Sequence, residues 1–355
     1  MMKKLEILLK RFILYLFLKY YRKKNGVSNI KDFTNKKVLF IRLNRIGDAL
    51  VTTPLLFLLK SKLNLIIHVF ADKKNYFVFS GQSFIDKTYV FNKGLTGYKK
   101  YKEILNIEKY DCVVDLHDDT SATVSFLLSM VSDSLVFGLR KNYLNLYSKT
   151  IERLDSTKYH VVERITEIAK LFNLSYTKEE LNIKYEYTKD DIKNVNEFLG
   201  QAYSETKPLV GINIIAGNRS RFWGINRFSA LIDFLQKYNV NILIITTPKE
   251  IKTAYDISGG QIPIYYSNKF TRISAIVSKL DFLFTPDTSI VHLASIYKIP
   301  VFGIYVKYNT NDIIWYAYKS KHEEFITEEP NFDNLNYELI EPKFKHFFEK
   351  IINGK

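Results

Sequence analysis

Cysteine is almost absent from this chain. Cys112 is the single cysteine among 355 residues, so no disulfide can form within the chain and a reducing compartment is expected. Because it lies in the apolar stretch DCVVDL, the thiol is expected to be buried and inert. The chain also lacks a G-x-G-x-x-G loop, a Walker A loop, an H-E-x-x-H motif and any cysteine–histidine cluster. These absences argue against dinucleotide, P-loop and zinc chemistry.

Long apolar runs near the N-terminus are missing as well. The longest, residues 12–18, is far shorter than the ~20 residues that cross a bilayer, and no A-x-A cleavage site follows it to suggest a secretory signal peptide. Residues 1–24 carry eight basic groups against one acid, a net +7 of the chain's +15. Their leucines and phenylalanines fall on one side of a helix, which predicts a basic amphipathic helix on an anionic membrane surface. Packing on the protein's own first domain is the alternative, and we find no nucleic-acid-binding motif.

The rest of the chain alternates strand-like and helix-like segments. A hydrophobic content of 46% excludes disorder, and the length suits two domains. Strands are predicted at 38–43, 65–70, 88–91, 112–116 and 135–137, and again at 209–214, 241–245, 262–265, 282–284 and 301–304. Helices are predicted near 48–62, 73–80, 121–131 and 159–172, from 190, and near 226–237, 249–258, 271–279, 288–296 and 341–352. This alternation predicts an α/β protein with parallel sheets covered on both faces.

The stretch KKVLFIRLNRIGDALVTTPLLFLLK, residues 36–60, is the most informative segment. It predicts a buried strand, a tight turn ending at Gly47-Asp48, and a helix that carries Pro54 in its body. Asp48 would then stand beyond the carboxyl end of the strand, where ligands of open α/β sheets bind. A helix-capping role is the alternative for this carboxylate.

A second segment, LDFLFTPDTSIVHLASIYKIPVFGIY at residues 280–305, has the same strand–loop–helix form. Asp287 and Thr288 would begin a helix whose free N–H groups favour an anion such as phosphate. His292 lies one turn further on the same face. A capped helix without a ligand is the alternative.

A third segment, GINIIAGNRSRFWGINRFSALIDFL at residues 211–235, runs from a strand into a polar loop that contains Gly217, Asn218 and Arg221. A cationic loop at the end of a parallel strand suits a diphosphate, which arginine can bind bidentately. A solvated loop with surface arginines is the alternative.

Together these segments resemble glycosyltransferase family 9, which includes the ADP-heptose:lipopolysaccharide heptosyltransferases. The family's opening strand, S-x-G-D and T-x-P helix look like RLNRIGDALVTTP, and its D-l-v-i-D-L-q strand looks like DCVVDLH. Its K-x-W-p loop looks like GNRSRFWGINRF, and its D-T-G-x-x-H-L-A segment looks like DTSIVHLA. The resemblance spans roughly residues 37 to 305 with the motifs in the right order.

The resemblance implies a GT-B fold, in which two Rossmann-like domains face each other across a cleft. It divides the chain into the amphipathic helix at 1–24, an acceptor-binding domain at 25–185, a nucleotide-sugar-binding domain at 186–335 and a C-terminal helix at 336–355. The last helix is expected to pack back towards the N-terminal domain.

The same resemblance implies an inverting, metal-independent transferase without a cofactor. Its donor would be a nucleotide-sugar, ADP-heptose, and its acceptor a lipid-A-core saccharide of lipopolysaccharide or lipooligosaccharide, at the cytoplasmic face of the inner membrane. Asp48 would be the general base. Donor-binding residues would be Gly217, Asn218, Arg221, Glu250, Asp287, Thr288, Ser289 and His292. Contacts to the anionic acceptor are expected from Arg42, Arg45, His117, Arg140 and Lys141, with surface solvation as the alternative for the four basic residues.

Four departures from the family pattern leave the donor sugar open. Asn44 replaces a serine, Ser289 replaces a glycine, Arg221 replaces a lysine, and ITTPKE lacks the glycines usual before Glu250. The alternatives are a GT-B transferase of a UDP- or GDP-sugar, a sugar-nucleotide epimerase, and a non-catalytic saccharide-binding member of the family.

Overall fold

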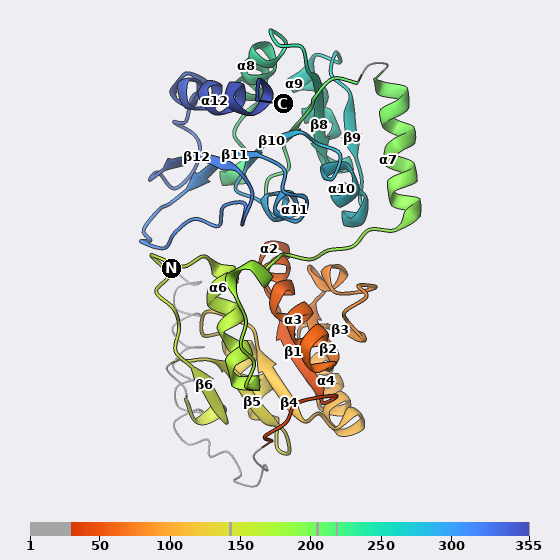
Figure 1. Ribbon diagram of the computed structural model, residues 1–355, viewed down its shortest axis with the longest axis vertical. Coiled ribbons are helices and arrows are strands. Elements are labelled where there is room, and N and C mark those ends of the chain that lie inside the picture. The colour runs from red at the N-terminus through yellow and green to blue at the C-terminus, as the bar shows by residue number, and fades with distance from the viewer. Residues whose placement is uncertain (1–29, 142–143, 204–205, 218, 355) are drawn as a thin grey trace. The chain divides into compact units, whose positions relative to one another are not determined.

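A computed structural model of the chain describes residues 30–354, except 142–143, 204–205 and 218. The predicted helix at 1–24 and Asn218 therefore lie outside the described residues. The chain divides into two compact units (Figure 1). The first comprises 30–155 and 161–181, and the second comprises 156–160 and 182–354.

The first unit is built on a six-stranded, all-parallel sheet with the order β3-β2-β1-β4-β5-β6. Its strands are β1 (Lys37–Arg42), β2 (Ile66–Asp72), β3 (Lys87–Phe91), β4 (Cys112–Asp115), β5 (Leu135–Leu139) and β6 (Lys149–Ile151). Its α-helices are α2 (Ile46–Leu50), α3 (Thr53–Leu63), α4 (Leu95–Glu108), α5 (Ala122–Ser129) and α6 (Val161–Thr166). Short 3₁₀ turns are η1 (Tyr76–Val78), η2 (Leu144–Leu146), η3 (Glu167–Phe172) and η4 (Lys178–Glu180).

The second unit has a six-stranded parallel sheet with the order β12-β11-β10-β7-β8-β9. Its strands are β7 (Leu209–Asn213), β8 (Asn241–Thr246), β9 (Ile264–Tyr266), β10 (Phe282–Pro286), β11 (Val301–Val306) and β12 (His322–Thr327). Its helices are α7 (Lys189–Ala202), α8 (Ile225–Leu235), α9 (Ile251–Ser258), α10 (Phe270–Val277), α11 (Ile290–Tyr297) and α12 (Tyr337–Ile352), with 3₁₀ turns η5 (Arg219–Arg221) and η6 (Pro248–Glu250). Numbered from its own first strand, each sheet has the 3-2-1-4-5-6 order of a dinucleotide-binding fold.

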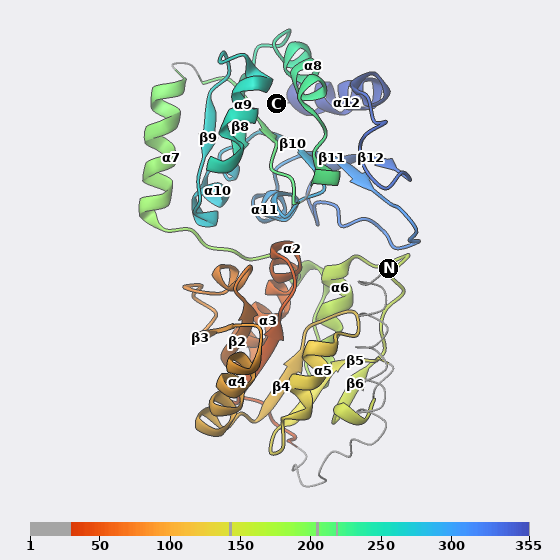
Figure 2. The same ribbon diagram turned by 180° about the vertical axis from the view of Figure 1, so that it is seen from behind.

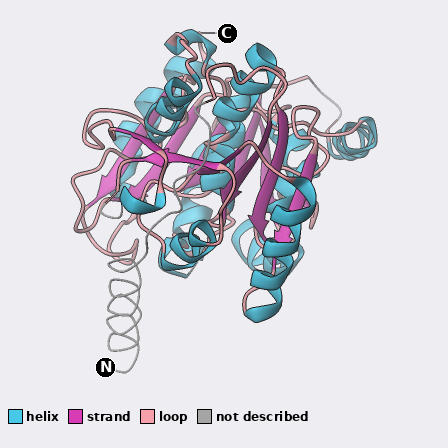
Figure 3. Ribbon diagram, turned by 90° about the horizontal axis from the view of Figure 1, so that it is seen from below, coloured by secondary structure: helices cyan, strands magenta, loops and turns pink. Residues whose placement is uncertain are grey.

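Apolar strands and two layers of helices explain why both sheets are parallel. In β1, Val38 to Ile41 are fully buried, as expected of a strand that is covered on both faces. Figure 1 shows α3 and α6 in front of the first sheet, and Figure 2 shows α4 and α5 over its other face. Figure 3, coloured by secondary structure, shows strands flanked by helices. Cys112 is buried in β4, as predicted.

The helix predicted over 48–62 is two helices rather than one. α2 ends at Leu50, and α3 begins at Thr53 with Thr52 as its N-cap. Pro54 therefore lies in the first turn of α3, where its missing N–H would have no helical partner, rather than in a helix body. The break separates the short helix that carries Asp48 from the longer helix that packs on the sheet.

The C-terminal helix α12 packs within the second unit, which corrects the expectation that it returns to the N-terminal domain. Phe344 packs against Phe282, Phe284 and Phe302 with ring centroids 6.0, 5.7 and 5.2 Å away, and Phe348 packs 5.2 Å from Phe282. The helix buries its aromatic face on β10 and β11 because those strands present phenylalanines to it. No helix among residues 30–354 is both long and apolar enough to cross a membrane.

Candidate active site

The ends of β1 and β4 form the point in the first unit where the strand order reverses. The backbone ladder between these two strands ends with Leu116 N–H donating to Ile41 O at 3.2 Å. The His117 ring then takes over the role of the next strand residue, because its Nε2 accepts the Leu43 N–H at 3.1 Å. Ligands of doubly wound sheets bind at such a switch point.

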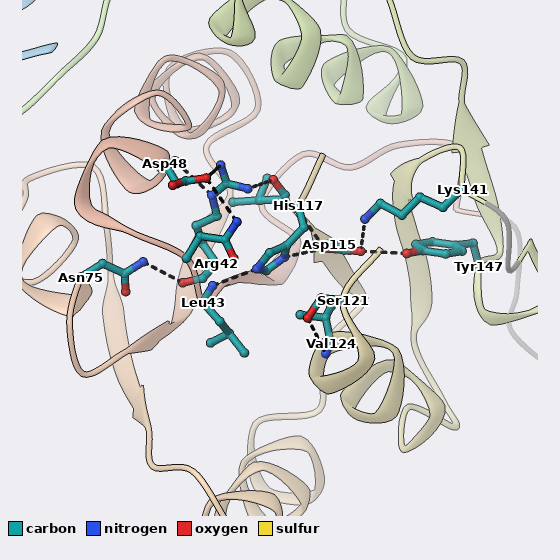
Figure 4. Close-up of polar contacts among 12 residues, drawn as sticks. Arg42, Leu43, Asp48, Asn75, Asp115, His117, Ser121, Val124, Lys141 and Tyr147 are labelled. Atoms are coloured by element: carbon teal, nitrogen blue, oxygen red, sulfur yellow. Dashed lines mark hydrogen bonds and ion pairs between the residues drawn. The ribbon is translucent and has the colours of Figure 1, made fainter. Parts of the chain in front are cut away.

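Asp48 is held at this switch point by Arg42, the last residue of β1 (Figure 4). The Arg42 guanidinium is 1% exposed and donates to the Asp48 backbone O at 3.0 Å, to Asp48 Oδ1 at 3.2 Å and to the Leu116 O. Asn44 Nδ2 also donates to Asp48 Oδ1, at 3.2 Å. Burial lowers the pKa of Arg42, and the Asp48 carboxylate opposes that shift. The N-cap of α2 is Arg45, so Asp48 does not cap the helix but is fixed by side chains.

Both donors to the Asp48 side chain reach the same oxygen. Within the described residues no hydrogen bond is made to Oδ2, and the side chain of Asp48 is 17% exposed. One carboxylate oxygen is therefore anchored, while the other makes no hydrogen bond among the described residues. A general base needs this kind of arrangement, because it must be held in place and still have an oxygen that can take a proton.

A second buried carboxylate, Asp115 at the end of β4, organises the residues behind Asp48. Its Oδ1 accepts from His117 Nδ1 at 2.8 Å and from the His117 backbone N–H at 2.9 Å. Its Oδ2 accepts from Tyr147 Oη at 2.7 Å and from Lys141 Nζ. Burial acts to raise the pKa of Asp115, but the Lys141 ammonium and the His117 donors outweigh it and hold the pKa well below its usual range. Asp115 is therefore an anion at neutral pH.

The structure divides the five residues predicted to contact the acceptor into two groups. Three of them are buried and bonded within the network just described: Arg42, His117 and Lys141. Solvation at the surface, the alternative for the two basic ones, is therefore wrong. Their proposed role changes from contact with the acceptor to positioning. Arg45 is exposed, and the side chain of Arg140 is 54% exposed and paired with Glu152, so these two remain candidates for acceptor contact.

The equivalent switch point of the second unit lies between the ends of β7 and β10. Asn213, the last residue of β7, reaches across and donates from Nδ2 to Thr285 Oγ1 at 2.9 Å and to Thr288 Oγ1 at 3.1 Å. Asn213 and Thr285 are fully buried, and Thr288 is half-buried at the start of α11. Thr285 Oγ1 donates in turn to the Pro286 O at 2.8 Å. Neutral groups thus fix the loop that carries Asp287 and Thr288.

Two charged residues stand at the rim of this loop. Arg221 Nε lies 3.5 Å from Asp287 Oδ2, and the two side chains are 24% and 37% exposed. Gly217 lies in the loop between β7 and η5, which contains Arg221, and Ser289 is the N-cap of α11. All four residues belong to the donor site that the sequence predicts, and the structure brings Arg221 and Asp287 into contact.

The remaining two residues of the predicted donor site lie on different elements. His292 is buried in α11, with its ring centroid 6.2 Å from that of Trp315. Glu250 is half-buried in η6, where its carboxylate accepts a hydrogen bond from Thr247 Oγ1. No group of three or more His, Cys, Asp or Glu side chains among the described residues is arranged to hold a metal ion.

Three residues that support the site, Asp115, Tyr147 and Asn213, are not among those expected from the sequence, and His117 is expected there only as a contact of the acceptor. Asp115 and His117 are two positions apart at the end of a strand, so their side chains point the same way, and this spacing was visible in DCVVDLH. Asn213 also ends a buried strand, a position where a polar side chain needs a partner. The long-range contact of Asp115 with Tyr147 has no local signal in the sequence.

The chain is similar to known glycosyltransferases in sequence. A sequence profile of glycosyltransferase family 9 (heptosyltransferase) matches residues 99–345. The lipopolysaccharide core heptosyltransferase OpsX of Haemophilus influenzae is 20% identical over 225 residues, which are 60% of this chain and 63% of that protein. The match thus spans less than two thirds of the length of this curated relative.

Solved structures resemble the whole described fold. The crystal structure of a family 9 glycosyltransferase from Veillonella parvula has a TM-score of 0.75 at 17% identity and covers 91% of this chain and 100% of that one. E. coli heptosyltransferase WaaC with ADP has a TM-score of 0.66 at 16% identity and covers 88% of this chain and 99% of that one. At these identities the likeness concerns the fold, and it confirms the predicted GT-B class.

Proposed function

The chain belongs to glycosyltransferase family 9, and on this premise we propose that it is an inverting glycosyltransferase that acts on a lipopolysaccharide or lipooligosaccharide core acceptor. The proposed donor is ADP-heptose. Similarity to OpsX, a core heptosyltransferase, and to WaaC, which has been solved with ADP-2-deoxy-2-fluoro heptose, supports this choice. The observation that carries the proposal is the carboxylate of Asp48, which is anchored through Oδ1 and has no hydrogen bond to Oδ2 among the described residues.

Asp48 would act as the general base in a direct displacement. The acceptor hydroxyl gives its proton to Asp48 Oδ2 while its oxygen forms the new bond to the anomeric carbon. The bond between that carbon and the diphosphate oxygen breaks, and its electron pair leaves with the nucleoside diphosphate. Attack from the face opposite the leaving group inverts the configuration, and a positioned base of this kind contributes roughly 10²–10⁴-fold to the rate.

The rim of the second switch point would bind the leaving group. A nucleoside diphosphate gains negative charge as the bond breaks, and cations or helix N-termini aimed at that charge stabilise the transition state. Arg221 is partly exposed beside Asp287, and the N-terminus of α11 follows Ser289. Gly217 and Asn218 of the same loop, with Thr288, His292 and Glu250, complete the proposed donor site. Arg45 and Arg140 are the proposed contacts of an anionic acceptor.

A panel of ADP-, UDP- and GDP-linked sugars tests this function on the purified full-length chain. We expect release of nucleoside diphosphate that depends on a lipid-A-core acceptor, is greatest with ADP-heptose, and gives a product of inverted anomeric configuration by NMR. If nucleoside diphosphate were released in the presence of acceptor only from a UDP- or GDP-sugar, that sugar nucleotide would be the donor in place of ADP-heptose. Interconversion of the sugar without an acceptor would instead identify an epimerase, and the absence of any turnover would favour a non-catalytic protein.

The N-terminal segment would hold the enzyme on the cytoplasmic face of the inner membrane. Near an anionic surface each Lys or Arg contributes about 1 kcal/mol, a contribution that salt weakens, and residues 1–24 carry a net +7. A chain without residues 1–24 should still transfer to a short water-soluble acceptor but fail on acceptor in anionic vesicles. Vesicle binding that survives the deletion, or a truncated chain that unfolds, would assign the segment to the protein's own core.

A further inference from the structure

The buried carboxylate of Asp115 is connected to Asp48 indirectly, by hydrogen bonds through His117 to the Leu43 N–H and then through the backbone to Arg42, which bonds Asp48 (Figure 4). We infer that Asp115 and His117 are positioning residues for the carboxylate of Asp48, and that the group they fix is the Leu43 N–H. This inference rests on the proposed role of Asp48 as the base. It explains how the carboxylate of Asp48 is held in position for that role.

The protonation state of His117 follows from its partners. Because Nε2 accepts the Leu43 N–H, it carries no proton, so the ring proton lies on Nδ1 and is donated to Asp115. Burial lowers the pKa of His117, while Asp115 acts to raise it and the nearby Arg42 and Lys141 cations act to lower it. The neutral ring with its proton on Nδ1 is thus the form that these contacts require, and Asp115 selects it.

Leu43 lies between the two residues that hold Asp48. Arg42 precedes it and bonds to both the backbone and Oδ1 of Asp48, while Asn44 follows it and bonds to the same Oδ1. The carbonyl of Arg42 is also fixed, by Asn75 Nδ2 at 3.1 Å. β1 has ended at Arg42, so no strand neighbour holds the Leu43 N–H. The His117 ring therefore holds the N–H of the Arg42–Leu43 peptide unit, and Asn75 holds its carbonyl.

Asp115 itself is held by residues beyond β5. Gly138 on β5 lies opposite Asp115 in the sheet, and a Cβ on Gly138 would stand 2.8 Å from Cε1 of Tyr147 and 3.4 Å from Cβ of Asp115. A glycine is therefore needed for the Tyr147 ring to lie where its hydroxyl reaches Asp115. With Lys141 on the same oxygen, the carboxylate is anchored from one side and presents Oδ1 to His117 on the other.

A pair of substitutions at His117 tests whether this residue positions Asp48 through the Leu43 N–H or only fills space in the core. In His117→Gln the side-chain Oε1 can occupy the place of Nε2 and accept the Leu43 N–H. In His117→Asn the shorter amide can reach Asp115 but not Leu43. We expect kcat of the full-length His117→Asn variant to fall by roughly 10-fold or more, because misplacement of a catalytic group by about 1 Å can lower the rate by 10². We expect His117→Gln to recover most of this loss of kcat, because it restores the acceptor for the Leu43 N–H although it loses the contact with Asp115, and we expect ADP affinity to be unchanged in both variants.

Two NMR signals test the inference independently of turnover. The imidazole ¹⁵N resonances of wild type should show a proton on Nδ1 of His117, and the side-chain amide signals of Asn44 should shift in His117→Asn but not in His117→Gln. A wild-type rate in folded His117→Asn, equal losses in both variants, or an Asn44 signal that stays unmoved would overturn the inference. An inactive wild type, or an active Asp48→Asn variant, would instead refute the proposed function, and the Asn44 signal would still decide whether His117 fixes the loop.

Tyr147→Phe provides a second route should His117→Asn fail to fold. This change removes a single hydrogen bond to Asp115 and keeps the ring. We expect a several-fold lower kcat at unchanged ADP affinity, and a kcat equal to that of wild type would contradict the inference.

Discussion

The two units share one strand order but use the equivalent switch points differently. In both, the last residue of the central strand reaches across to the end of the neighbouring strand. In the first unit this residue is Arg42, which bonds Leu116 and Asp48, and the supporting residues are the buried ions Asp115 and Lys141. In the second it is Asn213, which bonds two threonines, and the charged pair at the rim is partly exposed.

The difference corresponds to the two proposed tasks. A base must keep one geometry throughout the reaction, and a buried, fully bonded set of ions provides a rigid support. A site for a diphosphate must let a charged ligand enter and leave, so its cation is better placed near solvent on a scaffold of neutral groups. The charged side chains are therefore buried at the switch point of the first unit and partly exposed at that of the second.

Removal of the Lys141 charge should have the largest effect on stability. Lys141→Met leaves the Asp115 carboxylate buried without its cation, and breaking a buried ion pair in this way costs about 3–5 kcal/mol of unfolding free energy. Arg140→Met is the matched control, because Arg140 pairs with the exposed Glu152 and the loss of that surface pair should cost less than about 1 kcal/mol. Urea unfolding measures both. Equal losses of unfolding free energy in the two variants would mean that the buried ion pair at the first switch point stabilises the fold no more than the exposed pair of Arg140 does.

Removal of the Arg221 charge should weaken ligand binding rather than the stability of the fold. We expect Arg221→Ala to weaken ADP binding by roughly 10- to 100-fold, because a hydrogen bond to a charged group contributes about 1.5–3 kcal/mol. Arg221→Lys should recover part of this loss, since lysine restores the charge without the planar fork. Arg219→Ala, in the same loop and exposed, is the control. Calorimetry that finds ADP bound as tightly by Arg221→Ala as by wild type would move the diphosphate site elsewhere.

Acid pH should weaken the first switch point through His117, and this effect should be the smallest of the three. Its pKa is lowered in the fold, chiefly by burial, so its contribution to stability is complete above the unfolded value near 6.5 and is lost as the pH falls below it. Asp115, also lowered, acts in the same direction at lower pH, below the unfolded value of 3.8. Wild type should therefore lose more unfolding free energy than His117→Gln between about pH 7 and about pH 5. Parallel losses would show that His117 is not the titrating group.

Much of the scaffold could be predicted because its strands are continuous apolar runs. Val38 to Ile41 and Phe282 to Phe284 read as buried strands and lie in the sheets. Two of the four edge strands, β6 and β12, are not expected from the sequence, because they are half-buried and carry polar residues, as in HEEFIT. The lysine-rich helix α4 was missed for a similar reason, because few of its residues are buried.

The parts of the site that depend on neighbouring residues in the sequence could be predicted. Asp48 and Asp287 each follow a buried strand, which is a pattern in neighbouring residues. The burial of Arg42 and Lys141 is not such a pattern, because it depends on Leu116 and Asp115, which are 74 and 26 positions away in the chain. From composition alone a basic residue is expected at the surface, and only the position of its distant partner shows that it is buried.

The Asp48→Asn variant is the most direct test of the central claim. Asparagine keeps the size of the side chain and an oxygen for Arg42 and Asn44, but it cannot take a proton from the acceptor. Transfer from the preferred nucleotide-sugar and ADP affinity should be measured on the same preparation. The account predicts that kcat falls by roughly 10²–10⁴-fold while ADP affinity is unchanged. A folded variant that keeps more than about a tenth of the wild-type kcat would show that Asp48 is not the base.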